Sequence, residues 1–319
     1  MLRRLLVLAV AALVAAPAAL ADGQMPFAAQ GSPGAVSPDG SLRYLALNAG
    51  ANTVLAEVQT KDGTLHNETT LVGSYGIPSV VYGDVDEGLS HDGRTIVVGN
   101  TGLDASSRFL VFDTRTLRMT DWIVLKGSFA FDALSPDASR LYLIQHTEAK
   151  LGDYSRYVVR VYDLRTNRLL PGRIADRTQK GWVMDGYPLT RVTSADGRWV
   201  YTLYQNGGVG GYPFIHALDT VRGVAHCIGV PLAGQSGIYN LVLSLGGGGS
   251  TLAVHWKSGR PWLDVNTAAW RVEYVKAGVF PWGWTGTGLG GGLALAAAAL
   301  LLRRRRSAAG PVSVPAVTE

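Results

Sequence analysis

The 319-residue sequence predicts an all-β domain that is exported and then held at a membrane. Three observations predict this: an apolar leader at the start, five inexact copies of one turn, and an apolar segment followed by four arginines near the end. Hydrophobic residues make up 47% of the chain, which is enough for a large core.

The first 21 residues resemble a secretory leader. Arg3 and Arg4 precede an apolar run, and small residues at Ala19 and Ala21 favour cleavage before Asp22. We therefore expect residues 1–21 to be a signal peptide; the alternative is an uncleaved N-terminal anchor.

One copy of the repeated turn is "ALSPDASRLYLI", residues 133–144, in which Ala138 stands where three other copies have glycine. Ser and Asp side chains bond the nearby backbone, Pro fixes φ, and Gly accepts a positive φ, so such a turn joins two strands. Alternating or continuous apolar residues follow each copy and predict a strand. The aligned serines are Ser37, Ser90, Ser135, Ser194 and Ser244, at spacings of 53, 45, 59 and 50 residues.

A second pattern follows each turn: an apolar strand that ends in Asp, a short turn and another strand. It occurs at Asp113, Asp163, Asp219 and Asp264 and is blurred in the first copy. Each unit of about 50 residues therefore contains four strands in two hairpins. Helical periodicity is missing from Asp22 to Phe280.

Four-stranded units that repeat at this period are typical of a β-propeller, in which neighbouring blades cover each other's faces. The S-P-D-G turn, R-x-x-Y-L and V-x-D-x-R-T-x-x-L motifs resemble the YVTN and WD40-like propeller repeats of exported bacterial proteins. This resemblance implies a β-propeller over residues 22–279. We expect about five blades in a closed ring; six blades are the alternative.

Residues 280–302 form an uncharged apolar segment that ends at the cluster Arg303–Arg306. Its length suits a membrane-spanning helix, and the arginines mark the cytoplasmic side. We therefore expect a single-pass protein of the cell membrane, with the propeller on the extracytoplasmic side and residues 303–319 as a short basic cytoplasmic tail. The alternative is a C-terminal sorting signal that is cut off.

The charge of the chain argues against a nucleic-acid partner. Six of the 29 basic residues lie in the two terminal segments, and residues 22–279 carry 23 basic and 23 acidic side chains. The exported region therefore has no excess of positive charge of the kind that binds DNA or RNA. Cys227 is the single cysteine, so no intramolecular disulfide forms, and its apolar surroundings predict a buried thiol.

Familiar catalytic motifs are missing from the sequence, so we assign no catalytic residue, cofactor or resident metal. H-E-x-x-H, C-x-x-C and G-x-S-x-G do not occur, and the one G-x-G-x-x-G, residues 286–291, lies within the predicted span. The acidic cluster Asp84, Asp86 and Glu87 has oxygen ligands suited to Ca²⁺, but we interpret it as a solvated turn.

Candidate ligand-binding residues lie in segments that precede each turn, where we expect loops at the mouth of the central channel. These residues are aromatic, acidic or amide side chains. They are Tyr75, Asp84, Asp86, Phe131, Asp132, Asp185, Tyr187, Tyr239 and Asn240.

Together these features predict a membrane-anchored module that binds or scaffolds a protein or small-molecule partner. The alternative is a propeller-fold hydrolase or lyase with its site at the channel mouth. That alternative requires carboxylates and histidines, such as Asp132, Asp185 and His146, to converge in one pocket.

Overall fold

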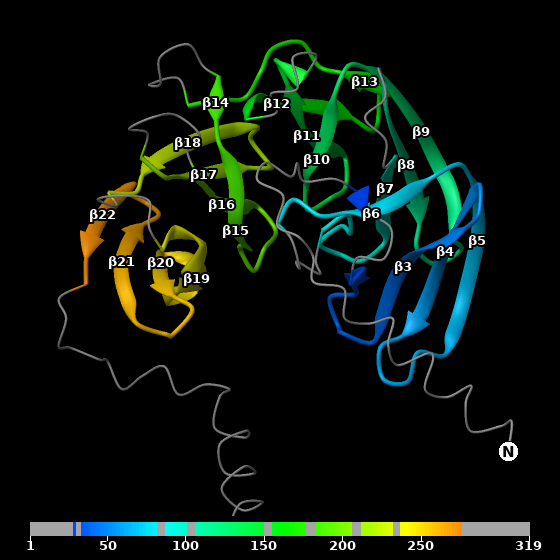
Figure 1. Cartoon of the computed structure of the whole chain (residues 1–319), viewed down its shortest axis with the longest axis horizontal. Helices are drawn as coiled ribbons and strands as arrows, with labels where there is room; N and C mark the ends of the chain where they lie inside the picture. The colour runs from blue at the N-terminus through cyan, green and yellow to red at the C-terminus, as the bar shows by residue number, and fades with distance from the viewer. Residues whose placement is uncertain are drawn as a thin grey trace, which may run out of the picture. The chain divides into compact units, whose positions relative to one another are not determined.

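A computed structural model describes residues 28–29, 33–81, 87–100, 106–149, 155–176, 183–205, 212–231 and 237–275. The secondary structure of the described residues is dominated by β-strands, with short 3-10 turns such as η4 (Ile238–Asn240) and η5 (Gly247–Gly249) (Figure 1). The predicted leader and the predicted span at residues 280–302 lie outside these ranges. Among the described residues no helix has the length and apolar character needed to cross a bilayer.

The first two sheets contain strands β1 to β9. The first sheet has the order β2 (Ala35–Val36), β3 (Leu42–Ala49), β4 (Asn52–Gln59) and β5 (Leu65–Val72). The second has the order β1 (Ala28–Ala29), β6 (Tyr75–Pro78), β7 (Thr95–Asn100), β8 (Ser106–Asp113) and β9 (Arg118–Lys126). Neighbouring strands in both sheets are antiparallel.

The other three sheets continue the series. The third is β10 (Phe129–Leu134), β11 (Arg140–His146), β12 (Arg156–Asp163) and β13 (Arg168–Leu169), with β14 (Met184–Asp185) paired to β12. The fourth is β15 (Tyr187–Thr193), β16 (Trp199–Gln205), β17 (Phe214–Asp219) and β18 (Val224–Gly229). The fifth is β19 (Leu241–Gly246), β20 (Thr251–Trp256), β21 (Pro261–Asn266) and β22 (Arg271–Tyr274).

Five sheets, each made of four strands consecutive in the chain, confirm the predicted five blades of a propeller. The described residues of the long interval between Ser135 and Ser194 form no sixth four-stranded sheet. The extra residues of this interval include β14, which pairs with β12 of the third sheet, and an isolated bridge from Ile174 to Val159. Likewise, β1 pairs with β6 and extends the second sheet.

Hydrogen bonds explain the repeated turn. In the third sheet, the Ser135 hydroxyl donates to the Asp137 carboxylate at 2.7 Å and accepts from the Arg140 N–H at 3.0 Å. Ser37, Ser90 and Ser194 make the equivalent bonds in the first, second and fourth sheets. Ala138 has φ 52°, where the other three turns have glycine, so this turn places a Cβ in the left-handed region.

The fifth turn differs from the prediction. Ser244 lies within β19, opposite Ala253, and the reversal occurs two residues later, between Gly246 and Thr251. Three successive glycines with positive φ, residues 247–249, form this turn in place of the Ser-Asp pair. The alignment on Ser244 is therefore wrong by two residues, because the turn had lost the Pro and Asp that mark the other copies.

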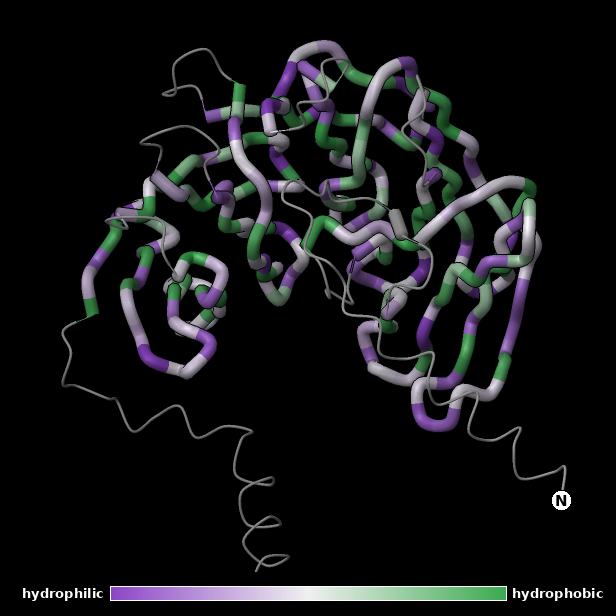
Figure 2. Tube along the Cα trace, viewed as in Figure 1, coloured by the Kyte–Doolittle hydropathy of each residue, from purple (hydrophilic) through white to green (hydrophobic). Residues whose placement is uncertain are grey.

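Alternating side chains on the strands build shared cores between successive sheets. One cluster joins the first and second sheets, a second joins the second, third and fourth, and a third joins the fourth and fifth. Figure 2 shows the matching alternation of hydrophilic and hydrophobic residues along many strands. Among the described residues, none of these clusters joins the fifth sheet to the first, and the closed ring stays a prediction.

Candidate functional site

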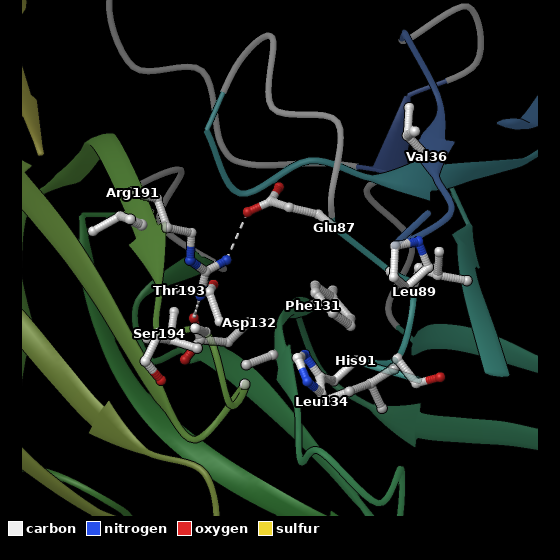
Figure 3. Close-up of a pocket in the computed structure, with 18 of the residues that line it drawn as sticks. Val36, Glu87, Leu89, His91, Phe131, Asp132, Leu134, Arg191, Thr193 and Ser194 are labelled. Carbon is white, nitrogen blue, oxygen red and sulfur yellow. Dashed lines mark hydrogen bonds and ion pairs between the residues drawn. The ribbon is translucent and has the colours of Figure 1, made fainter. Parts of the chain in front are cut away.

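A cavity of about 430 Å³ is lined by residues of β2, β10 and β15, by turn residues next to them, and by residues 87–91 between β6 and β7 (Figure 3). This volume lies within the usual range for small-molecule pockets. Apolar side chains line part of the wall, and hydroxyl, carboxylate, guanidinium and imidazole groups line the rest. The apolar lining includes Val36, Leu89, Phe131, Leu134 and Val200, and the polar lining includes Ser37, Glu87, Ser90, His91, Asp132, Arg191 and Ser194.

A buried ion cluster from three sheets lies at this cavity. The Arg191 guanidinium donates through one Nη to Glu87 at 2.6 Å and through the other to Asp132 at 2.7 Å. All three side chains are 5% exposed. The second Glu87 oxygen accepts the buried Val80 N–H, which further fixes this carboxylate. Three successive blades are therefore tied to one another by charge at the channel.

Burial makes this cluster electrostatically strong. Loss of solvent by itself lowers the pKa of Arg191, but the charges of Glu87 and Asp132 outweigh it and raise the pKa above its ordinary value. Burial, with the added effect of Asp132, also raises the pKa of the neighbouring Tyr204 hydroxyl. The cluster holds two carboxylates against one guanidinium, so it has a net negative charge when all three groups are ionised.

The repeated turns pack against one another at the same cavity. His91 replaces the turn proline in the second sheet, and its ring lies so close to Gly197 that a Cβ there would approach His91 Cγ to 2.9 Å. Pro38 packs similarly against Gly93. Turns from different blades therefore meet here, and His91 is the turn residue that adds a titratable side chain to the cavity wall.

A row of polar side chains leads from the cavity along one face of the fourth sheet. Arg191, Thr202, His216 and Cys227 are direct partners across β15, β16, β17 and β18, so their side chains share one face. Residues on this face pack in the core that the fourth sheet shares with the third. The His216 Nδ1 lies 2.8 Å from the Met184 sulfur of β14.

Burial changes the pKa of two members of this row. Loss of solvent lowers the pKa of His216 to about 4, which keeps the imidazole neutral near pH 7. Burial, aided by Asp176, raises the pKa of the Cys227 thiol to about 12. The thiol, predicted to be buried, is half-buried and packs against the shared core.

The structure brings two of the nine candidate residues, Phe131 and Asp132, to the cavity. Tyr75 is 6% exposed and packs in the core of the first two sheets. Asp185 and Tyr187 lie in β14 and at the start of β15 and are not among the cavity lining. Tyr239 and Asn240 are exposed in η4, and Tyr239 donates to Gln205 at 2.5 Å.

Asp84 and Asp86 lie outside the described residues, so their predicted role stays untested. His146 also does not line the cavity. In the described part of the chain, no group of three His, Cys, Asp or Glu side chains is placed to hold a metal ion.

The expectation that the candidates lie in loops is wrong for most of them. Phe129–Leu134 and Tyr187–Thr193 are the first strands of their sheets, and Tyr75–Pro78 lies between β1 and β7 in the second sheet. All residues of β6 and β10 are buried, so these strands show no polar alternation that would identify them.

Sequence reasoning did not select Glu87, Arg191 or His91 as site residues. A signal for the ion cluster was present, because Glu87, Asp132 and Arg191 each stand three residues before the turn serine of their own repeat. Equivalent positions of neighbouring blades meet around a channel, so charges of opposite sign at one repeat position indicate an ion pair.

Comparisons with known proteins find solved structures of similar fold but do not assign the chain to a family. A scan against protein-family models finds no match, and a search of curated proteins also finds none. Among solved structures, hydrazine synthase of Kuenenia stuttgartiensis is similar, with a TM-score of 0.47 and 18% identity over 73% of this chain and 63% of that one.

Two further similar structures are propeller-containing proteins. TolB of Acinetobacter baumannii has a TM-score of 0.38 and 14% identity, over 75% of this chain and 55% of that one. The β-propeller domain of Cps50 (Swd1) from Myceliophteria thermophila has a TM-score of 0.42 and 8% identity, over 74% and 64%. This chain thus spans less than two thirds of each of the three structures.

Proposed function

We propose that this chain is a membrane-anchored extracytoplasmic β-propeller that binds a small molecule or a segment of a partner protein in the cavity lined by Glu87, Asp132 and Arg191. The observation that carries the proposal is the cavity itself, whose volume of about 430 Å³ suits a compact ligand. The buried ion cluster supports it, because it holds the surrounding strands in fixed positions before any ligand arrives.

The chemistry of the wall supports a ligand with both apolar and polar parts. Phe131 and Leu134 offer apolar surface, while Thr193 and His91 offer hydrogen bonds. Both Arg191 Nη atoms already contact carboxylates, so recognition falls to the hydroxyl and imidazole groups rather than to the arginine.

A capture experiment in intact cells tests the binding role. Thr193 is exposed and lines the cavity, so Thr193→Trp should obstruct it without disturbing the core. Thr116→Trp, in the hairpin that joins β8 to β9, is the matched control. We expect a partner or ligand to be recovered with the wild-type chain and with Thr116→Trp, and lost with Thr193→Trp. Equal recovery by all three chains would count against the cavity.

The predicted anchor has a separate test. Deletion of residues 286–306 should move the protein from the membrane fraction to the soluble extracytoplasmic fraction. If the deleted chain still sediments with membranes, the anchor is elsewhere, and the cavity proposal is unaffected.

The second candidate function is a hydrolase or lyase, which one observation favours. His91 lines the same cavity as the carboxylates of Glu87 and Asp132, and these residue types perform general acid and base catalysis. A captured ligand that is recovered chemically changed by the wild-type protein, but intact from His91→Ala, would favour the enzyme. A ligand that is recovered intact from both would favour the binding module.

A further inference from the structure

Three sulfur and nitrogen donors meet in the interface between the third and fourth sheets. His216 and Cys227 are direct partners on β17 and β18, which places their Cβ atoms about 5 Å apart on one face. Met184 of β14 brings its thioether sulfur to 2.8 Å from His216 Nδ1. An imidazole, a thiol and a thioether thus come from three strands of two sheets.

His216 has a lone pair that the described residues do not use. His216 is 3% exposed, and its Nε2 has no hydrogen-bond partner in the described part of the chain. Because Nδ1 faces the sulfur, we assign the imidazole proton to Nδ1, which leaves the lone pair on Nε2. Leaving a buried nitrogen of this kind unpaired is unfavourable, and a bound ligand would remove that cost.

We propose that His216 Nε2 and the Cys227 thiolate bind one monovalent soft cation, Cu(I) or its analogue Ag(I), with Met184 as the positioning residue that holds the imidazole. Thiolate, thioether and imidazole donors select this class of ion over hard ions such as Mg²⁺ and Ca²⁺. On binding, Cys227 loses its S–H proton to solvent as the sulfur–metal bond forms, and the ion keeps its oxidation state.

Charge also favours a monovalent ion here. A thiolate and a univalent cation together are neutral, so binding adds no net charge to the interface. The nearby Asp176 carboxylate already accepts the Cys227 N–H at 2.8 Å, so it holds the strand that carries the thiol.

Anaerobic titration of the purified full-length chain with Cu(I), in competition with a chromophoric chelator, tests the site. We expect one equivalent to bind, with affinity reduced at least 100-fold in Cys227→Ser and about 10-fold in Met184→Leu. The controls are Met119→Leu, at a methionine that is 52% exposed, and His66→Gln, at an exposed histidine. Both controls should bind as the wild type does.

Two further measurements keep the proposal testable if one variant folds poorly. Cys227→Ala puts no hydroxyl in the apolar interface and should lose Cu(I) in the same way as Cys227→Ser. X-ray absorption of the loaded protein should show nitrogen and sulfur neighbours. Wild-type affinity in both Cys227 variants, or loss of binding in Met119→Leu or His66→Gln instead, would overturn the proposal.

Discussion

The two faces of the fourth sheet differ sharply in chemistry. The face toward the fifth sheet is mainly apolar, with Tyr201, Leu203 and Ile215 packed in a cluster with Leu252 and Leu263. His226 also lies on this face, where its ring stacks on Trp270. The face toward the third sheet carries the polar row from Arg191 to Cys227 within an otherwise apolar core. One sheet thus has a face that supplies hydrophobic stability and a face that buries charge and titratable groups.

The difference shows on which face folding must desolvate charged and polar groups, which costs free energy. Burying apolar surface is favourable without further conditions, whereas a buried charge is stable only when its partners are in place. The polar face therefore depends on groups far away in the sequence, and the apolar face depends on shape alone. Substitutions on each face separate these two kinds of stability.

The largest expected effect is on the polar face. Arg191→Met removes the cation and leaves Glu87 and Asp132 buried without it, so we expect the free energy of unfolding to fall by about 3–5 kcal/mol. Arg115→Met is the control, because Arg115 is 71% exposed and pairs with Asp113 at the surface, so its loss should change stability far less. Denaturant unfolding measures both. Equal losses would mean that the cluster is no stronger than a surface pair.

Removing volume from the apolar face should have the next largest effect. Leu252 is fully buried in the cluster of the fourth and fifth sheets. Leu252→Ala should cost about 2–4 kcal/mol through lost burial and the cavity that remains. Leu65→Ala, at a leucine that is 52% exposed, is the matched control and should cost well under that by the same unfolding measurement. A similar loss for both would show that the two leucines are equally packed.

Acidification should weaken the polar face but not the apolar one. His216 has a folded pKa of about 4, below its ordinary value of 6.5, so the unfolded chain takes up a proton first as the pH falls. Stability should therefore decline between about pH 6.5 and pH 4, by up to about 3 kcal/mol. His216→Phe should flatten this part of the pH profile, whereas His66→Gln should not. An unchanged slope in His216→Phe would assign the decline to other groups.

The smallest effect is expected at a turn outside both faces, which supplies a baseline. Ala138 has φ 52°, a conformation that glycine adopts without steric cost. Ala138→Gly should raise the free energy of unfolding by about 0.5–1 kcal/mol, because relief of strain exceeds the added flexibility of the unfolded chain. A loss of stability in thermal unfolding would show that the turn is not strained.

Local sequence predicted the blades because their signals are local. The Ser135, Asp137 and Arg140 bonds lie within six residues, and the strand after each turn follows at once. Strand β10 was harder to recognise, since residues such as Phe131 are buried on both sides and show no alternation. The fifth turn was misaligned because glycines had replaced the residues that the pattern requires.

The site was only partly predictable because its contacts are distant in sequence. Arg191 binds Asp132 across 59 residues and Glu87 across 104, and a single strand gives no sign of either partner. Comparison of the same position across repeats would have indicated the cluster. The His216 contact with Met184 spans 32 residues between different sheets, and no repeat position indicates it.

The long reach of the Arg191 contacts has a kinetic consequence. Each sheet is made of consecutive strands and forms from contacts between near neighbours, whereas the bond to Glu87 requires the second and fourth sheets to be docked already. We therefore expect the cluster to form after the rate-limiting step of folding, so that its loss chiefly speeds unfolding. We thus expect the ion cluster to govern the unfolding rate, and so how long the assembled blades stay together, more than the folding rate.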